Sequence, residues 1–132
     1  MKNLFLNITN HNLTGDQKLD ININNFEPVE LPEALKQRWG QMTPDNWKDT
    51  YEDVLKFALD LKADELVCLI AGYAPAVYNL TYDLDRRGDT VVFADSKRVS
   101  IESTDANGTV TKNSVFKHQG FYNSITGEKW SL

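Results

Sequence analysis

Residues 65–71 read ELVCLIA and are followed by Gly72 and Tyr73. A run this short, almost wholly apolar and rich in β-forming residues, is typical of a central parallel strand that is covered on both faces. Cys68 is the one cysteine of the chain, and its apolar neighbours predict a buried thiol rather than a reactive one. The run is too short for a membrane helix, which needs about 20 apolar residues. This stretch therefore predicts a strand at the centre of an α/β fold.

Strand and helix patterns alternate on both sides of this run. A strand covered on both faces is expected at residues 3–8, and an edge strand at residues 26–31, where Pro28 cannot donate to a central ladder. Strands that alternate with helices imply βαβ units, so the sequence predicts a parallel sheet flanked by helices. Helical spacing, or a capping box at Thr14 and Gln17, predicts helices within residues 14–25, 31–42, 47–59 and 76–87.

The C-terminal third of the chain has a different pattern. A fourth strand is expected at residues 90–94 and to end at residues 95–98. Beyond it, apolar and polar residues alternate with period 2, and a turn at residues 105–108 precedes a returning run at 110–116. These features predict an antiparallel β-hairpin attached to the sheet. Three aromatic residues of the tail are expected to pack back onto the domain or onto a partner: Phe121, Tyr122 and Trp130.

The length and charge of the chain limit the classes of function. The 132 residues correspond to a single domain over residues 1–132. A formal net charge of −5 argues against a surface that coats DNA or long RNA, but it leaves room for a small local anion site. The N-terminus lacks the apolar segment of a signal peptide, and no apolar run is long enough to span a membrane, so we expect a cytoplasmic protein.

Polar and cationic residues follow three of the expected strands. In open α/β sheets, ligands bind beyond the carboxyl ends of the strands, so these residues are expected to meet at one rim. Lys97 and Arg98 can hold phosphate. Tyr73 can stack on a base, and His11 can shuttle a proton. The candidate site residues are Asn10, His11, Asn12, Gly72, Tyr73, Ser96, Lys97 and Arg98.

Each candidate also has a purely structural explanation. Polar loop residues are common after strands, Gly72 can simply end a strand, and Tyr73 can be a core aromatic. Lys97 and Arg98 can belong to a solvated face, although they follow a strand in an acidic protein. Lys117-His118 can reach the same site from the hairpin, but a solvent-facing role is favoured for this pair.

Other known catalytic patterns are missing from the sequence. It contains no glycine-rich dinucleotide motif, no Walker-type motif and no zinc-ligand spacing. Helical spacing places most of the clustered aspartates in solvent, so we expect no metal and no cofactor. Phosphodiester chemistry without metal means attack by the neighbouring 2′-hydroxyl of RNA, which needs alignment of the ribose and positive charge on the phosphate. The clustered aspartates are Asp83, Asp85, Asp89 and Asp95.

Short motifs over most of the chain are shared with one known family: Leu4-Phe5-Leu6, residues 10–14, Gln17, residues 30–35, Trp39, the strand to Gly72, residues 92–98, 108–110 and 112–118, and Phe121. Through these motifs the chain resembles the small Rossmann-like CRISPR-associated ring nucleases of type III systems. The family favours Ser-His where this chain has Asn10-His11, and its helix before the second strand is longer than residues 14–25 permit. The resemblance implies a Rossmann-like (CARF-like) parallel sheet with flanking helices and a C-terminal antiparallel β-hairpin.

The same resemblance implies an activity. Members of the family bind a cyclic oligoadenylate, commonly cyclic tetra-adenylate, between the two subunits of a homodimer, and a two-fold symmetric ring suits such a cleft. They cleave it without metal to linear products that end in a 2′,3′-cyclic phosphate, which switches off type III antiviral signalling. Carried onto this chain, Lys97 and Arg98 would clamp phosphates and His11 would orient the hydroxyl or assist proton transfer. The hydrogen-bonding and stacking contacts would come from Ser96, Gly72 and Tyr73, beside Asn10 and Asn12.

Two alternatives from other classes stay open. A non-catalytic sensor would bind the cyclic nucleotide and only relay a signal, which the absence of a fused effector domain disfavours. A flavodoxin-like interaction module would bind another protein through its helices and would have no affinity for nucleotides.

Overall fold

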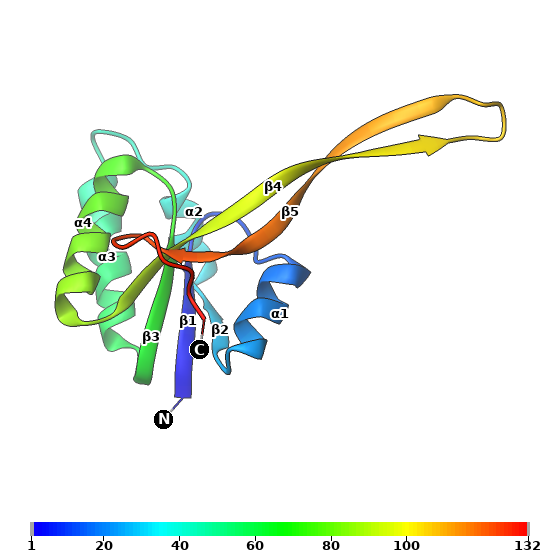
Figure 1. The fold of residues 1–132 in the computed structure, drawn as a ribbon. Coiled ribbons are helices and arrows are strands. Elements are labelled where there is room, and N and C mark those ends of the chain that lie inside the picture. The colour runs from blue at the N-terminus through cyan, green and yellow to red at the C-terminus, as the bar shows by residue number, and fades with distance from the viewer. Residues whose placement is uncertain (1, 132) are drawn as a thin grey trace.

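A computed structural model describes residues 2–131, and it has the mixed α/β architecture predicted from the sequence (Figure 1). The predicted domain also includes residues 1 and 132, which lie outside the described residues. The sheet has five strands, β1 Lys2–Ile8, β2 Glu27–Glu30, β3 Ala63–Ile70, β4 Thr90–Thr104 and β5 Val110–Asn123, in the order β2-β1-β3-β4-β5. The helices are α1 Gly15–Ile23, α2 Glu33–Trp39, α3 Trp47–Asp60 and α4 Ala74–Arg87.

The first four strands run parallel, and β5 pairs with β4 in the antiparallel sense. The predicted parallel sheet with a C-terminal antiparallel pair is therefore confirmed. Pro28 lies in β2 at the edge of the sheet, as a residue without an N–H donor requires. The strand predicted at residues 65–71 is the central strand β3, and it is hydrogen-bonded to neighbours on both sides.

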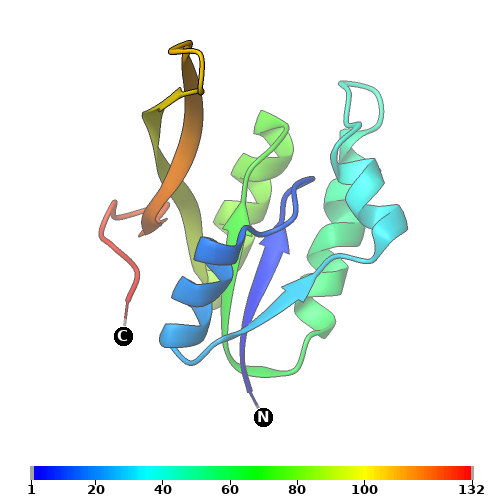
Figure 2. The same ribbon diagram turned by 90° about the vertical axis from the view of Figure 1, so that its right-hand side faces the viewer.

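Alternate residues of β1 and β3 point to opposite faces of the sheet, and each face carries its own hydrophobic cluster. Leu6 and Cys68 belong to the cluster under α2, α3 and α4, whereas Phe5 and Val67 belong to the cluster on the α1 side. Helices flank both faces of the sheet in Figure 2. This two-sided covering explains why both strands are almost continuous apolar runs.

Local sequence signals set the ends of two helices. Thr14 and Gln17 form the predicted capping box, in which each residue bonds the backbone N–H of the other, at 2.9 and 3.2 Å. The second signal is Gly88, which terminates α4 in the left-handed conformation, with φ of +102°. The predicted capping box is therefore confirmed, and so is the predicted end of α4 at residue 87.

The predicted end of the fourth strand at residues 95–98 is wrong. β4 runs without interruption from Thr90 to Thr104, and β5 pairs with it along its length, apart from one bulge next to Asp95. The paired strands extend beyond the rest of the sheet as a two-stranded arm, which we define as residues 95–119 (Figure 1). Four polar residues in a row resemble a strand end, but each strand of the arm satisfies the other's backbone hydrogen bonds, so pairing continues. The hairpin itself is confirmed, with its turn at residues 105–108.

The tail is predicted to pack either onto the domain or onto a partner, and in the structure it packs onto the domain. Phe121 is fully buried, and the Trp130 ring lies 5.4 Å from the Phe5 ring and 5.1 Å from the Phe26 ring, between centroids. Cys68 is also fully buried, which confirms the predicted buried thiol, and burial raises its pKa. Among residues 2–131, no helix is both long and apolar enough to cross a membrane.

Candidate functional site

The carboxyl ends of β1 and β3 form a switch point in the sheet. From β1 the chain passes to β2 at one edge, and from β3 it passes to β4 on the other side. Ligands of open α/β sheets bind at such points. A crevice of about 210 Å³ lies there, lined by Asn7, Thr9, His11, Asn12, Leu13, Gln17, Leu69, Ala71, Phe93 and Ala94.

A buried polar pair shapes the loop that follows β1. Asn7 is 1% exposed and lies inside an otherwise apolar strand. Its amide nitrogen donates to the backbone carbonyl of His11 at 2.8 Å, and the Thr9 hydroxyl accepts from the His11 backbone N–H at 3.2 Å. These bonds fold residues 9–12 back over the end of β1, which projects the His11 side chain outward from the sheet. The buried side chains of Asn7 and Thr9 therefore hold the loop in place.

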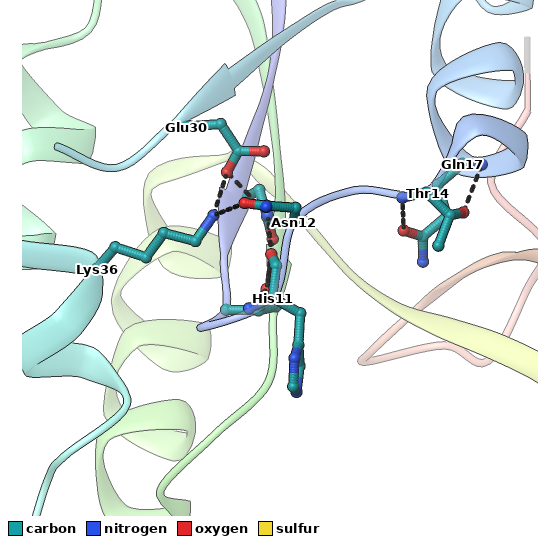
Figure 3. A network of polar contacts seen from close by, with 8 residues as sticks. His11, Asn12, Thr14, Gln17, Glu30 and Lys36 are labelled. Carbon is teal, nitrogen blue, oxygen red and sulfur yellow. Dashed lines mark hydrogen bonds and ion pairs between the residues drawn. The ribbon is translucent and has the colours of Figure 1, made fainter. Parts of the chain in front are cut away.

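A second junction joins this loop to β2 and α2. The Lys36 ammonium donates to the Asn12 side-chain oxygen at 3.0 Å and to the Glu30 carboxylate at 3.1 Å, and Glu30 also accepts from Asn7 at 2.9 Å. The Lys36 side chain is only 10% exposed, so its charge is largely removed from water and needs this carboxylate. Figure 3 shows the His11 ring extending away from the junction.

A larger hollow lies on the other side of the loop, between residues 10–12 and α2. Its volume is about 550 Å³. His11 and Asn12 line both this hollow and the crevice at the switch point, so they form a shared wall. The other lining residues are Asn10, Glu33, Lys36, Gln37, Gly40 and Gln41. Three of the predicted site residues, Asn10, His11 and Asn12, are thus brought together here.

Gly72 and Tyr73 occupy a different part of the surface. Gly72 lines an apolar hollow of about 580 Å³ beside α4, together with Tyr78, Tyr82 and Ile125. Its φ of +152° and the indole of Trp39 leave no space for a side chain, since a Cβ at Gly72 would lie 2.8 Å from Trp39 Nε1. Tyr73 is half-buried and precedes the first turn of α4, where its carbonyl accepts from Val77 N–H. Gly72 thus has a defined packing role, and the contacts expected of both residues with a ligand stay predictions.

Ser96, Lys97 and Arg98 are placed on the arm rather than at a strand end. Lys97 is paired across the two strands with Lys117, and Arg98 with Phe116, whose ring lies 5.6 Å below the guanidinium. All five of these residues are exposed. Two lysines directly opposite each other repel, so this pair weakens the arm unless an anion lies between them.

His118 is not the solvent-facing residue favoured from the sequence. Its Nε2 lies 2.8 Å from the Asp20 carboxylate, its ring packs 4.7 Å from Phe121, and its side chain is 9% exposed. The bond joins the base of the arm to α1. His118 is therefore a structural link between two elements that are far apart in the sequence.

The clustered aspartates do not converge. Asp83 accepts a short hydrogen bond from the Tyr51 hydroxyl, while Asp89 pairs with Arg87 at 3.4 Å. Burial and the Asp83 carboxylate raise the pKa of Tyr51 to about 12. Within residues 2–131, no three His, Cys, Asp or Glu side chains come close enough together to hold a metal ion.

Three features of the site escaped the sequence analysis. Lys36 lies within the helix predicted in residues 31–42, yet its ammonium reaches the β1 loop, and Glu30 completes that contact from the end of β2. The available signal was Asn7, a polar residue between Leu6 and Ile8 in a strand expected to be buried, because such a residue needs buried partners. Lys117 was also set aside, although the hairpin register places it opposite Lys97.

These features define a mixed α/β protein whose polar residues gather at the carboxyl ends of its parallel strands. The chain belongs to the family described as the uncharacterized protein MJ1673 family, which it matches over residues 3–122. No curated protein and no solved structure matches the chain.

Proposed function

We propose that this protein is a Rossmann-like ring nuclease of the cytoplasm. It cleaves a cyclic oligoadenylate, with cyclic tetra-adenylate as the first candidate, and thereby ends type III CRISPR antiviral signalling. The observation that carries the proposal is the position of His11 on the shared wall between two hollows at the switch point of the sheet. The resemblance of the sequence to ring nucleases supports the choice of substrate.

The proposed reaction uses only groups of the chain and of the RNA ring. The 2′-hydroxyl attacks the adjacent phosphorus, the bond to the 5′-oxygen breaks, and the product ends in a 2′,3′-cyclic phosphate. The proton of the 2′-hydroxyl is lost as the new bond forms, and the departing 5′-oxygen gains one. His11 orients the hydroxyl or assists this transfer, while Asn12 and the Lys36 junction hold the His11 loop in place.

The arm supplies the cations of the proposal. Figure 2 shows the arm rising from the same edge of the sheet at which β1 and β3 end. Lys97 and Lys117 face each other across the two strands on one face of this arm, and Ser96 and Arg98, at alternate positions of β4, lie on its other face. A phosphate between Lys97 and Lys117 would relieve their repulsion. We assign phosphate binding to Lys97 and Lys117 on this face, and to Arg98 with Ser96 on the other face.

We further propose that the active form is a homodimer. Apolar residues of the arm are exposed, and a two-stranded hairpin without further packing is marginally stable in water. A second copy of the chain would cover the arm and present the same loops twice to a symmetric ring. The exposed apolar residues are Ile101, Val110, Val115 and Phe116.

One experiment tests the activity. Purified protein is incubated with cyclic tetra-adenylate and excess chelator, and the products are resolved under single-turnover conditions. We expect linear fragments with a cyclic phosphate end, at a rate lowered about 100-fold or more by His11→Ala and lost with Lys97→Ala. Unchanged cleavage by His11→Ala would exclude the role of this residue. Binding without turnover would instead identify a sensor.

A protein-docking module is the second candidate. The apolar hollow beside α4, with Tyr78 72% exposed and Ile125 57% exposed, favours it. This candidate predicts no affinity for cyclic tetra-adenylate at all. The same incubation therefore separates it from both nucleotide-binding alternatives.

A further inference from the structure

We infer that the hollow between residues 10–12 and α2 is a subsite for a nucleobase with a 6-amino group. The inference rests on the proposed function and adds a place where one adenine of the ring is recognised. This place is distinct from the crevice at the switch point, but it shares the His11–Asn12 wall with that crevice. A base in the hollow would thus lie directly beside the residue assigned to the reacting ribose.

Several side-chain amides line the hollow without forming hydrogen bonds to other residues in the range 2–131. Asn10, Gln37 and Gln41 are exposed, and none of their side chains has a hydrogen-bond partner among residues 2–131. An amide can accept from the 6-amino group of adenine and donate to N7 at the same time, which is the pairing that proteins use to read this base. The amides of the lining therefore fit the edge of adenine, and Glu33 and Lys36 add one charge of each sign.

One of these amides lies against the C-terminal end of α2. A Cβ placed at Gly40 would lie 3.0 Å from Cβ of Asn10 and 3.1 Å from its amide nitrogen. The glycine therefore lets Asn10 lie directly on the end of the helix that also carries Gln37. This close approach brings amides from the β1 loop and from α2 to the same hollow.

A buried charge completes the hollow. The Lys36 ammonium has three N–H donors, and two of them are used by Asn12 and Glu30. The third is available to an oxygen of the ligand, such as a ribose hydroxyl. The exposed His11 side chain, which lines the hollow, can stack on a base, as histidines do in RNA-binding sites. The volume of about 550 Å³ lies within the usual range for small-molecule sites.

Binding and cleavage can be separated in the test. The probes are cyclic tetra-adenylate and cyclic tetra-inosinate, each with 2′-O-methyl groups that remove the attacking hydroxyl. Inosine has an oxygen in place of the 6-amino group, so an amide set for adenine meets two acceptors and rejects it. Calorimetry gives the dissociation constants of both rings for the full-length protein, for Gln37→Ala combined with Gln41→Ala, and for the control Asn22→Ala. Asn22 is an exposed amide on α1, away from the hollow.

We expect the wild-type protein and Asn22→Ala to bind the adenine ring about 10-fold or more tightly than the inosine ring, and the double variant to bind both within about 2-fold. Equal binding of the two rings by wild type, or a preference kept by the folded double variant, overturns the subsite. Cleavage of unmodified cyclic tetra-adenylate would then still stand as evidence for the proposed function. If wild type binds neither ring, the proposed function fails and the subsite fails with it.

Discussion

The indole Nε1–H of Trp39 donates to the backbone carbonyl of Ala71 at 2.9 Å and ties α2 to the end of β3. The next residue, Gly72, lies against the same indole. One side of the hollow between residues 10–12 and α2 is formed by α2 itself, and the switch point lies at the end of β3. This hydrogen bond therefore joins the two elements that frame the candidate site.

We expect Gly72→Ala to lower the free energy of unfolding by about 1–3 kcal/mol, because it adds strain at positive φ and a contact with the indole. Denaturant titration followed by tryptophan fluorescence measures the change. The matched control is Gly15→Ala, since a Cβ there has nothing within 4 Å and the residue lies in the first turn of α1. A glycine-to-alanine change at Gly72 as harmless as the control would contradict this account.

Lys36→Met tests the junction that holds the His11 loop. The change removes the ammonium but keeps a side chain of similar length, and it removes the hydrogen bonds to Asn12 and Glu30, of which Glu30 keeps the one from Asn7. We expect a loss of about 1–3 kcal/mol in stability, because hydrogen bonds to a charged group are broken. Chemical denaturation measures it, and Lys56→Met on the exposed face of α3 is the control. Equal effects of the two variants would show that the junction adds nothing to stability.

Much of the fold follows from patterns that are local in the sequence. The apolar runs in β1 and β3, the capping box at Thr14 and the stop at Gly88 each depend on residues a few positions apart, and local physics sets them. The length of β4 does not follow in this way. A polar strand end and a polar paired strand have the same composition, and only the partner strand β5 distinguishes them.

The candidate site was predictable in part for the same reason. The rule for strand ends locates Asn10, His11 and Asn12, because it uses only strand order and sequence position. Lys36 contacts Asn12 across 24 residues of sequence, and no local pattern encodes that contact. Long-range polar contacts of this kind have to be read from the packed structure.

Tyr51 gives a prediction for alkaline pH. Its ordinary pKa of 10.0 rises to about 12 in the folded protein. Between these pH values the unfolded chain loses the phenolic proton and the folded protein keeps it, so stability falls as pH rises. We expect Tyr51→Phe to remove this part of the decline while lowering stability slightly at neutral pH through the lost bond to Asp83.

Thermal unfolding at several pH values from 8 to about 11.5 measures the two slopes. A decline in the Tyr51→Phe variant as steep as in wild type would assign the alkaline loss to other groups. Tyr78→Phe is a suitable control, because Tyr78 is 72% exposed.

Cys68 is expected to be unreactive in the native state. Its side chain is fully buried in β3, and burial raises its pKa, so the thiolate needed for alkylation is scarce. We expect iodoacetamide to label the protein at neutral pH only at the rate of unfolding, and labelling to become rapid in denaturant. Mass spectrometry at timed intervals follows the reaction. Fast labelling without denaturant would mean that β3 opens readily.

Lys117→Ala should change stability and binding in opposite directions. Lys117 faces Lys97 across the arm, and removing one of two like charges relieves repulsion, which is worth a few tenths of a kcal/mol up to about 1 kcal/mol. The variant without ligand should therefore be as stable as wild type or slightly more stable. With cyclic tetra-adenylate it loses a phosphate contact, so binding should weaken and the salt dependence of binding should decrease.

Lys112→Ala is the control, because Lys112 pairs with Glu102 at 3.4 Å instead of facing a lysine. A merely solvated Lys117 would give the first effect without the second, so the combination of the two measurements decides whether the arm binds phosphate.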